Sequence, residues 1–333
     1  MGNITILGAG AWGTAVALAL ARRHDVLMWG RHAAAMQAMD AARENTDYLP
    51  GFPFPPALRV TGELGEALAH VTGEAPLLIA ACPVAGLRPL LEQLKGQPIP
   101  HIVWLCKGFE SGTGLLPHQV VREVLGEDLP AAALSGPSFA QEVARGLPCA
   151  LTVASTTPAL CESVVAAVHG SGIRVYSSND LAGVEVGGAV KNILAIATGV
   201  ADGLGLGLNA RAALITRGLA EITRLGTRLG GQVGTFMGLT GMGDLILTCT
   251  GDLSRNRRVG LGLAAGKALD TIVHELGHVA EGVPCAKAVR ELAARLGVEM
   301  PITDAVAGVL FDGVPPQQMV AQLMARDPRG EGA

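Results

Sequence analysis

The sequence predicts an α/β protein, with a doubly wound parallel sheet domain followed by a mainly helical C-terminal domain. Its 333 residues favour two domains. Short apolar runs alternate with helical patterns up to about residue 177, which is typical of parallel strands joined by crossover helices. After about residue 180 the strand patterns fade and Ala/Leu/Gly-rich helical stretches dominate. We therefore expect a sheet domain over residues 1–180 and a helical domain over residues 181–333.

The elements can be placed in chain order from these patterns. The apolar runs of strand length are Ile4–Leu7, Val26–Trp29, Leu77–Ala81, Ile102–Leu105, Ala131–Leu134, Ala150–Val153 and Arg174–Ser177. Between them lie helical stretches long enough to cross over, namely Thr14–Arg23, Val84–Leu94, Pro117–Leu125 and Pro158–Val168. The expected helices of the second domain are Val184–Ala201, Ala210–Leu229, Arg257–Ala265, Cys285–Leu296 and Pro316–Met324.

Composition excludes several classes of protein. With 49% apolar and 16% charged residues, the chain is expected to be compact and globular. A net charge of -4, without Lys/Arg runs interleaved with aromatic residues, argues against nucleic acid as a partner. Six cysteines without a C-x-x-C pair indicate neither a zinc site nor a disulfide framework. Because signal-peptide and uncharged membrane-spanning patterns are also absent, we expect a cytoplasmic protein without stable membrane insertion.

The first motif with chemical content is Gly8-Ala9-Gly10-Ala11-Trp12-Gly13, a G-x-G-x-x-G between a predicted strand and a predicted helix. Its glycines permit a tight turn and a close approach of the backbone to a pyrophosphate. The helix start adds unpaired N–H donors and a partial positive charge. In this setting the motif predicts a Rossmann-type dinucleotide-binding domain, and the alternative is a merely structural turn.

The end of the second predicted strand bears on the choice of dinucleotide. A site selective for NAD usually has Asp or Glu there, where it holds the ribose hydroxyls. This chain instead has Arg31 and His32, and an arginine suits a 2′-phosphate. We therefore expect NADPH as cofactor, with NADH as the second choice. The alternative is that Arg31 is only a solvated loop charge.

Two lysines stand out because the chain has five lysines beside twenty arginines. Lys107 follows the strand Ile102–Leu105, and Lys191 lies in a helical stretch whose neighbouring residues are mostly small and apolar. Lysine can lose its proton where arginine cannot. Burial on such a face lowers a lysine pKa, and a change from about 10.4 to near 7–8 needs roughly 4 kcal/mol. Both are candidates for catalysis, although Lys191 could instead pack its stem and extend its amine to water.

Two further segments could hold an anionic ligand. Ser254 is expected to cap a helix whose first turn carries Arg255 and Asn256, and this arrangement forms a phosphate cradle from backbone N–H groups and a guanidinium. The alternative is a basic helix surface. Gly136 and Ser138 follow a strand and precede a helix, so they too could present N–H groups to a ligand, or simply form a turn.

The segment His274-Glu275-Leu276-Gly277-His278 matches the zinc-protease pattern H-E-x-x-H. Gly277 interrupts the turn that would have to hold both histidines on one helical face, so we expect the helix to end there. We therefore expect no metal site.

In combination, these segments closely resemble the bacterial NAD(P)-dependent glycerol-3-phosphate dehydrogenases over nearly the whole chain. The resemblance rests on a specific ordered series that begins with Gly8–Gly13 and K-G at Lys107. It continues with L-S-G-P-S-F-A at 134–140, G-A-V-K-N at 188–192, N-A-R-A-A-L-I-T-R-G at 209–218, G-D-L-x-L-T-C-T at 243–250, S-R-N-R-R at 254–258 and Glu281-Gly282.

The resemblance implies reduction of dihydroxyacetone phosphate to sn-glycerol 3-phosphate for glycerophospholipid synthesis, with Lys191 as proton donor and acceptor and Lys107 beside the substrate carbonyl. The substrate-binding positions it implies are Lys107, Gly136, Ser138, Lys191, Asp244, Ser254, Arg255 and Asn256. The cofactor-binding positions are Gly8, Gly10, Ala11, Trp12, Gly13, Arg31, His32, Tyr48, Lys107, Ala140, Arg255, Val279 and Glu281. At residue 11 this chain has Ala where many relatives carry Ser or Asn, which leaves the backbone donors in place.

Two other functions fit part of the pattern. One is an NADPH-dependent reductase of another small keto acid, similar to ketopantoate reductase. The other is a non-catalytic NADPH sensor, which would keep Gly8–Gly13 but need neither Lys107 nor Lys191. In every case we expect the ligand where the two domains meet, and for the dehydrogenase we expect a small phosphate ester as substrate and a homodimer.

Overall fold

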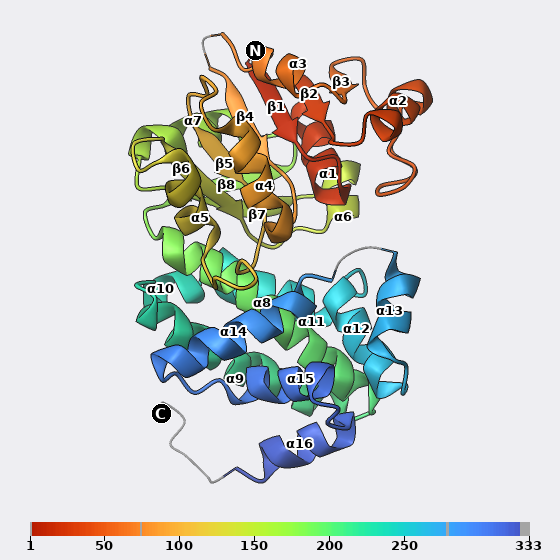
Figure 1. Cartoon of the computed structure of the whole chain (residues 1–333). Coiled ribbons are helices and arrows are strands. Elements are labelled where there is room, and N and C mark those ends of the chain that lie inside the picture. Colours follow the sequence, from red (N-terminus) through yellow and green to blue (C-terminus); the bar gives the residue numbers. More distant parts are fainter. Residues whose placement is uncertain (1, 74, 278–279, 327–333) are drawn as a thin grey trace. The chain divides into compact units, whose positions relative to one another are not determined.

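The computed structural model describes residues 2–73, 75–277 and 280–326. The chain forms two compact units, Met1–Glu110 with Leu115–Glu185, and Ser111–Gly114 with Val186–Ala333. The first unit holds a sheet flanked by helices and the second is helical, which confirms the predicted fold class (Figure 1). The second unit includes a short piece of the first half of the sequence, and the main division falls inside a helix, slightly beyond residue 180.

One eight-stranded sheet in the order β3-β2-β1-β4-β5-β6-β7-β8 forms the centre of the first unit. The strands are β1 (Asn3–Leu7), β2 (Asp25–Trp29), β3 (Leu58–Thr61), β4 (Leu77–Ala80), β5 (Ile102–Trp104), β6 (Ala131–Ser135), β7 (Cys149–Ala154) and β8 (Ile173–Ser178). All were predicted except β3, which has only four residues, with Arg59 exposed.

The sheet is not wholly parallel, because β7 runs antiparallel to β6 and β8 is parallel to β7. The expectation of a purely parallel sheet was wrong at this point. The only helix between β6 and β7 is α6 (Ala140–Arg145), whose 6 residues span about 9 Å. β6 rises about 17 Å over its five residues. Because so short a helix cannot carry the chain back along the sheet, the next strand runs in the opposite direction.

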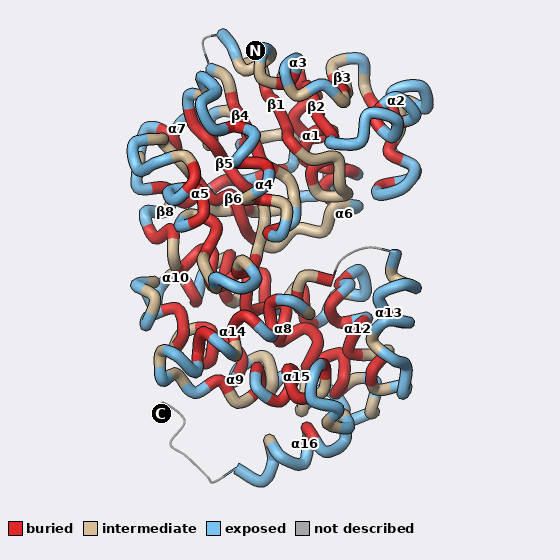
Figure 2. The backbone as a smooth tube through the Cα atoms, in the orientation of Figure 1, coloured by how far each residue is buried: buried red, intermediate tan, exposed pale blue. Residues whose placement is uncertain are grey.

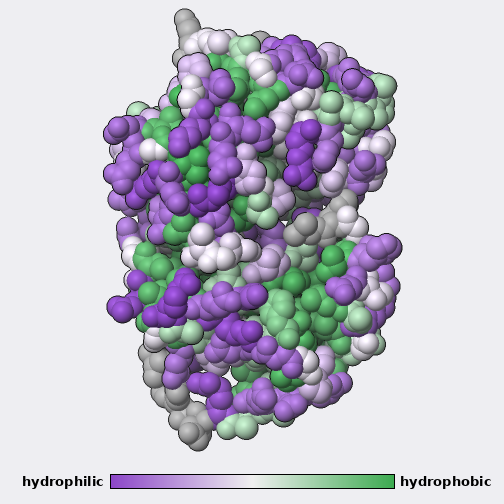
Figure 3. Space-filling model, viewed as in Figure 1, coloured by the Kyte–Doolittle hydropathy of each residue, from purple (hydrophilic) through white to green (hydrophobic). Residues whose placement is uncertain are grey.

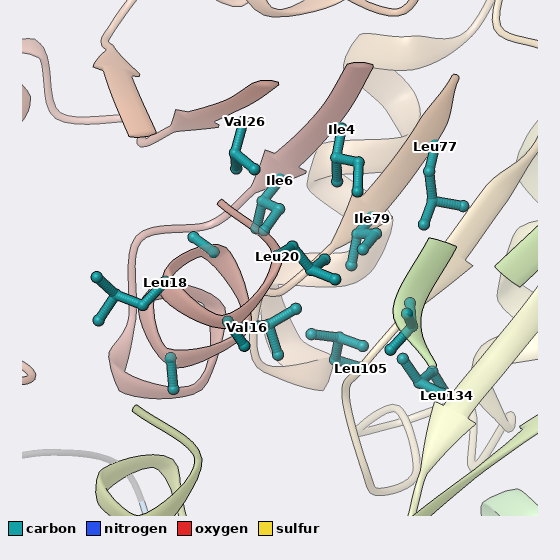
Figure 4. Close-up of a cluster of buried hydrophobic side chains, with 14 of the residues drawn as sticks. Ile4, Ile6, Val16, Leu18, Leu20, Val26, Leu77, Ile79, Leu105 and Leu134 are labelled. Carbon is teal, nitrogen blue, oxygen red and sulfur yellow. The ribbon is translucent and has the colours of Figure 1, made fainter. Parts of the chain in front are cut away.

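Helices cover both faces of the sheet. Besides α6 they are α1 (Ala11–Leu20), α2 (Ala33–Ala42), α3 (Leu64–Ala69), α4 (Val84–Leu94), α5 (Pro117–Leu125) and α7 (Pro158–Val168). Successive strand residues point to opposite faces. In β4, Leu77 and Ile79 join a core cluster with α1, whereas Leu78 and Ala80 join another with α4 and α5. Figure 4 shows the first cluster, with Ile4 and Ile6 of β1 facing Val16 and Leu20 of α1.

The second unit is built around α8 (Leu181–Gly203), in which residues 183–201 are all buried (Figure 2). A helix that is apolar all round belongs in a protein interior or a membrane. By length and hydropathy α8 could cross a membrane, but its most apolar window is entirely buried inside the protein. The other elements are α9 (Gly207–Arg228), α10 (Val233–Phe236), the π-helical turn η1 (Leu239–Gly243), α11 (Asp244–Thr250), α12 (Arg255–Ala264), α13 (Leu269–Leu276), α14 (Gly282–Leu296), α15 (Pro301–Phe311) and α16 (Pro316–Met324).

A buried carboxyl group holds two of these helices together. Glu221 of α9 accepts hydrogen bonds from the backbone N–H groups of Ile302 and Thr303 and from the Thr303 hydroxyl, at the start of α15. Burial raises the pKa of Glu221 to about 7 from 4.5, although these hydrogen bonds act in the opposite direction. In the folded protein the carboxyl therefore binds its proton more tightly than in the unfolded chain.

This carboxyl predicts a pH dependence of stability. Below pH 4.5 it is protonated in both states, whereas between 4.5 and 7 only the folded state keeps the proton. The free energy of unfolding should therefore fall, by about 3 kcal/mol from this group, as pH rises through that window. Urea unfolding of Glu221→Gln should lack this component, while Glu291→Gln, at an exposed carboxyl, should retain it. Parallel curves for wild type and Glu221→Gln would contradict the assignment.

Candidate active site

The glycine loop between β1 and α1 needs glycine for steric reasons. Gly8 has a φ of +132°, and a Cβ there would lie 2.6 Å from the Ala81 carbonyl oxygen. A Cβ on Gly13 would collide with the Gly8 carbonyl oxygen and lie 2.9 Å from the Ala81 Cβ. The first turn of α1 is thereby pressed against the ends of β1 and β4, so any side chain at Gly8 or Gly13 would push it away.

The same loop fits a pyrophosphate. Gly10 is the N-cap of α1, and no atom lies within 4 Å of the position that its Cβ would occupy. The first turn, which includes Ala11 and Trp12, contains no acidic residue. Its N–H groups have no partners within the helix, and the helix dipole adds partial positive charge. The residues present therefore fit a bound dinucleotide.

Asn45, which the sequence analysis did not identify, holds this loop in place by hydrogen bonds. Asn45 is 1% exposed, and its Nδ2 donates to the Ala9 carbonyl oxygen at 2.9 Å and to the Thr14 hydroxyl at 2.7 Å. Its Oδ1 accepts from the N–H of Tyr48 at 3.1 Å, which places this predicted cofactor residue, itself largely exposed, beside the loop. One side chain thus fixes both the loop and the position of Tyr48.

Asn45→Ala should weaken dinucleotide binding about tenfold, because the hydrogen bonds that hold the Ala9 carbonyl oxygen and the Thr14 hydroxyl are lost. Fluorescence titration with NADPH measures this directly. Asn209→Ala, at an exposed position on α9, is the matched control. An unchanged affinity in a folded Asn45→Ala protein would show that the loop needs no such support.

The end of β2 carries no carboxylate. Arg31 and His32 follow Trp29-Gly30 there, both side chains are exposed, and the Arg31 Nε donates to the His32 Nε2 at 3.1 Å. His32 is also the N-cap of α2, whose first turn holds no acidic residue. The position is therefore cationic and open to solvent, as a 2′-phosphate would require.

Lys107, Gly136 and Ser138 come together at the ends of β5 and β6. The Lys107 Nζ donates to the Gly136 carbonyl oxygen at 2.9 Å, and the Ser138 hydroxyl donates to the same oxygen at 3.1 Å. Gly136 has a φ of +140°, and a Cβ there would lie 2.9 Å from the Ala150 carbonyl oxygen. Ala140, a predicted cofactor position, is the first residue of α6.

Lys191 lies at the centre of the polar cluster in the second unit. It is 6% exposed, and its Nζ donates to Asp244 Oδ1 and, at 2.9 Å, to the Thr248 hydroxyl. Its neighbours along α8 are small and apolar, as predicted. The Asp244 carboxylate, itself 1% exposed, pairs with the Lys191 ammonium, so each buried charge has a partner of opposite sign.

Glycine allows Asp244 to reach this lysine. A Cβ on Gly187 of α8 would lie 2.5 Å from the Thr240 carbonyl oxygen and 3.3 Å from the Gly241 Cα, both in η1. Because Gly187 has no side chain, η1 packs directly on α8. Asp244, the first residue of α11, therefore lies next to Lys191. Single π-helical turns are frequent at functional sites.

The predicted phosphate cradle forms at the start of α12. Ser254 caps the helix, with its hydroxyl accepting from the Arg257 N–H at 3.2 Å, and Arg255 is exposed in the first turn. Asn256 is buried: its Nδ2 donates to Asn192 Oδ1 and its Oδ1 accepts from the Gly282 N–H, both at 2.9 Å. The Asn256 amide therefore ties the cradle to α8 and to α14.

Not every basic residue of this segment is available to an anion. Arg257 is 9% exposed and pairs with Asp202 and Asp252 at 2.8 and 2.9 Å, while Arg211 also pairs with Asp202. These pairs anchor α12 to the end of α8 and to α9. Arg255 remains the exposed guanidinium of the first turn.

The remaining predictions concern the segment before α14. Glu281 is the N-cap of α14, and Val279 lies outside the described residues, as does His278 of the H-E-x-x-H pattern. α13 ends at Leu276 with Gly277 in the left-handed conformation, as predicted, and Glu275 pairs with Lys267 on the surface. Among the described residues no group of three or more His, Cys, Asp or Glu side chains could hold a metal ion.

Two family descriptions together match almost the whole chain. Residues 3–161 match the N-terminal part of NAD-dependent glycerol-3-phosphate dehydrogenase, and residues 180–321 match its C-terminal part. The chain belongs to this family. The resemblance inferred from the sequence motifs is thereby confirmed, and the family is one of NAD(P)-dependent oxidoreductases.

Two named relatives match this chain over almost its whole length. The protein named glycerol-3-phosphate dehydrogenase (NAD(P)+) of Paucimonas lemoignei is 70% identical over 99% of this chain and 98% of its own length. The one from Herminiimonas arsenicoxydans is 68% identical over 99% of this chain and 100% of its own.

Solved structures agree with the glycerol-3-phosphate dehydrogenase assignment. The glycerol-3-phosphate dehydrogenase of Coxiella burnetii has 42% identity and a TM-score of 0.92, covering 97% of this chain and 98% of its own. A ketopantoate reductase from Ralstonia eutropha, with 16% identity and a TM-score of 0.57 over 96% of this chain and 100% of its own, shares the fold alone.

Asn45, Asn192 and Thr248 are the polar site residues that sequence reasoning missed. Thr248 had a usable signal, since it lies one helical turn after Asp244 and so shares its face of α11. Asn192 directly follows Lys191. Asn45 had no local signal, because its partners Ala9 and Thr14 are distant in sequence.

Proposed function

We propose that this chain reduces dihydroxyacetone phosphate to sn-glycerol 3-phosphate, and catalyses the reverse oxidation, with NAD(P)H as cofactor. The observation that carries this proposal is the buried Lys191, held by Asp244 and Thr248, in a chain that belongs to the glycerol-3-phosphate dehydrogenase family. When bound, the dinucleotide supplies the hydride that C2 of the ketone receives. The protein must then bind the substrate, orient it and supply one proton.

Lys191 is proposed to donate that proton to the C2 oxygen. Reduction of a ketone places developing negative charge on this oxygen, and a nearby ammonium both stabilises the charge and delivers the proton. Because Asp244 and Thr248 fix the direction of the Lys191 Nζ, little reorganisation is needed during the reaction. In the reverse direction the amine accepts the proton.

The phosphate is proposed to rest on the first turn of α12. Arg255 and Asn256 supply the backbone N–H groups of this turn, and Arg255 adds an exposed guanidinium. No acidic residue lies in this turn. The Asn256 side chain holds the turn in place through its hydrogen bonds to Asn192 and Gly282. Lys107, fixed by the Gly136 carbonyl oxygen, is proposed to orient the carbonyl end of the substrate.

The pocket for the adenosine ribose is proposed to prefer NADPH over NADH. The exposed Arg31 and His32 at the end of β2 support this preference, since a 2′-phosphate would gain a cationic partner there. Glu281 and Val279 are retained as proposed cofactor contacts.

Product analysis tests the reaction. Purified protein with dihydroxyacetone phosphate should oxidise NADPH, and NADH less efficiently, and should form one equivalent of glycerol 3-phosphate. The reverse reaction should consume the sn-3 enantiomer only. NADPH binding without product would favour the sensor function instead.

A homodimer in the cytoplasm, without membrane insertion, is part of the proposal. Val233 and Met237 of the second unit are 53% and 52% exposed, and Figure 3 shows apolar surface on that unit. In the proposed dimer a second copy covers such surface. All six cysteines are thiols, which suits a reducing compartment. Light scattering should give twice the mass of one chain. The protein should be recovered in the supernatant without detergent, because it does not insert into a membrane.

A further inference from the structure

Two cysteines follow neighbouring strands of the first unit. Cys82 comes two residues after Ala80, the last residue of β4, and Cys106 comes two residues after Trp104, the last residue of β5. The two strands are adjacent and parallel in the sheet (Figure 1). Both side chains are half-buried, and both are thiols.

The register of β4 and β5, continued two residues beyond its last pair, points to these cysteines as opposite each other. Before them, Ala80 pairs with Trp104, and the Leu105 N–H donates to the Ala80 carbonyl oxygen at 2.9 Å. After them, a Cβ on Gly108 would lie 3.2 Å from the Val84 Cγ2. The offset is the same on both sides, since 104 − 80 = 24 and 108 − 84 = 24, and it is also 106 − 82 = 24. The segments that carry the cysteines, a bend before α4 and the loop after β5, therefore approach each other on both sides of Cys82 and Cys106.

The two thiols also share a face. Ala80 and Trp104 lie in the core cluster formed with α4 and α5, and both cysteines pack against that cluster. The strands that lead to them are about 4.8 Å apart, and a disulfide allows a Cα separation of roughly 4.4–6.8 Å. Among the described residues no third thiol, His or carboxylate completes a metal site there, so thiol chemistry is the use that the geometry favours.

The two cysteines adjoin two candidate site elements of the first unit, the glycine loop and Lys107. The Cys82 backbone nitrogen lies 3.1 Å from the position of a Cβ on Gly8, so Cys82 packs against the glycine loop. Cys106 directly precedes Lys107, whose Nζ is held by the Gly136 carbonyl oxygen. A bond between the two sulfurs would therefore link the segment that packs against Gly8 of the glycine loop to the backbone next to Lys107.

We propose that Cys82 and Cys106 form a redox-sensitive dithiol that closes to a disulfide when a peroxide oxidises it. One thiolate attacks a peroxide oxygen and becomes a sulfenic acid with release of water, and the second thiol then displaces a second water to form the S–S bond. Overall, two thiols and one hydrogen peroxide give one disulfide and two waters. Two equivalents of a small thiol restore the pair and are themselves oxidised to a disulfide.

Closure weakens dinucleotide binding. A disulfide holds its Cβ atoms about 3.8 Å apart, whereas opposite residues in a sheet place theirs about 5 Å apart. The two segments must therefore move by about 1 Å, and a misplacement of that size can lower an enzyme's rate by about 10²-fold. The contact of Cys82 with Gly8 transmits this movement to the loop. This regulatory effect rests on the proposed function, whereas disulfide formation does not.

The test uses the full-length protein, reduced and then treated with hydrogen peroxide. The wild type should lose about 2 Da in intact mass, give a linked Cys82–Cys106 peptide after digestion, and bind NADPH at least about tenfold more weakly by fluorescence titration. Dithiothreitol should restore both mass and affinity. Cys82→Ser and Cys106→Ser should show neither change, while Cys149→Ser, at a half-buried thiol on β7, should behave as the wild type.

Two results would overturn the proposal. If peroxide consumes thiols without forming the linked Cys82–Cys106 peptide, these two cysteines do not form a disulfide. The peptide could form without any change in NADPH affinity, which would exclude its regulatory effect. Reduced protein that fails to bind NADPH would contradict the proposed function. The linked-peptide measurement would still show whether Cys82 and Cys106 form a disulfide.

Discussion

Lys191→Ala is expected to lower kcat for reduction of dihydroxyacetone phosphate by at least about 10³-fold, because proton transfer and stabilisation of the developing oxyanion are lost together. The substitution also leaves Asp244 buried without its cation. Its thermal stability must therefore be measured beside kcat. Steady-state kinetics with NADPH in excess separates the loss of catalysis from a change in cofactor binding.

Lys191→Arg distinguishes proton transfer from charge alone. Arginine can pair with Asp244 but does not give up its proton at neutral pH, so activity should stay close to that of the alanine variant. Lys287→Ala, at an exposed lysine on α14, should have wild-type kinetics. An arginine variant within about tenfold of wild type would remove Lys191 from the acid-base role.

Arg255→Ala is expected to raise the KM for dihydroxyacetone phosphate by about 10- to 100-fold, since charge-assisted hydrogen bonds to a phosphate are worth about 1.5–3 kcal/mol. Because the phosphate is remote from the reacting carbon, kcat should fall less. Arg255 is exposed in the first turn of α12, so the fold should tolerate its loss.

Arg258→Ala is the matched control, because this arginine is also exposed and lies on the same helix. Its KM should be that of the wild type. Equal effects of the two substitutions would indicate a general electrostatic attraction of the substrate, and an unchanged KM in Arg255→Ala would remove the phosphate from this helix start.

Most of the fold could be predicted because its signals are local. The glycine loop stands between an apolar run and a helix, so β1 and α1 follow from Gly8–Gly13 and their flanks. The helix start at Arg255 could be predicted because Ser254 is a good cap. The direction of β7 could not, since an apolar strand reads the same in parallel and antiparallel pairing, and the length of α6 was the deciding quantity.

The candidate site could be predicted only in part, for a related reason. Lys191 stood out by its residue type and setting, but the sequence spacing did not show that η1 packs on Gly187 and so brings Asp244 to it. Asn45 was missed because its partners are chosen by the tertiary fold. Residues that act through long-range hydrogen bonds leave no periodic pattern, so the structure is needed to find them.

NADPH oxidation with dihydroxyacetone phosphate, unphosphorylated dihydroxyacetone and ketopantoate, each assayed with the same preparation, decides which substrate this enzyme reduces. We expect kcat/KM to be highest for the phosphate ester, by at least about 10²-fold over dihydroxyacetone, because only the ester can use the cradle at Ser254 and Arg255. Equal turnover with and without the phosphate would show that the start of α12 binds no phosphate, and turnover with ketopantoate alone would show that the chain reduces a keto acid instead.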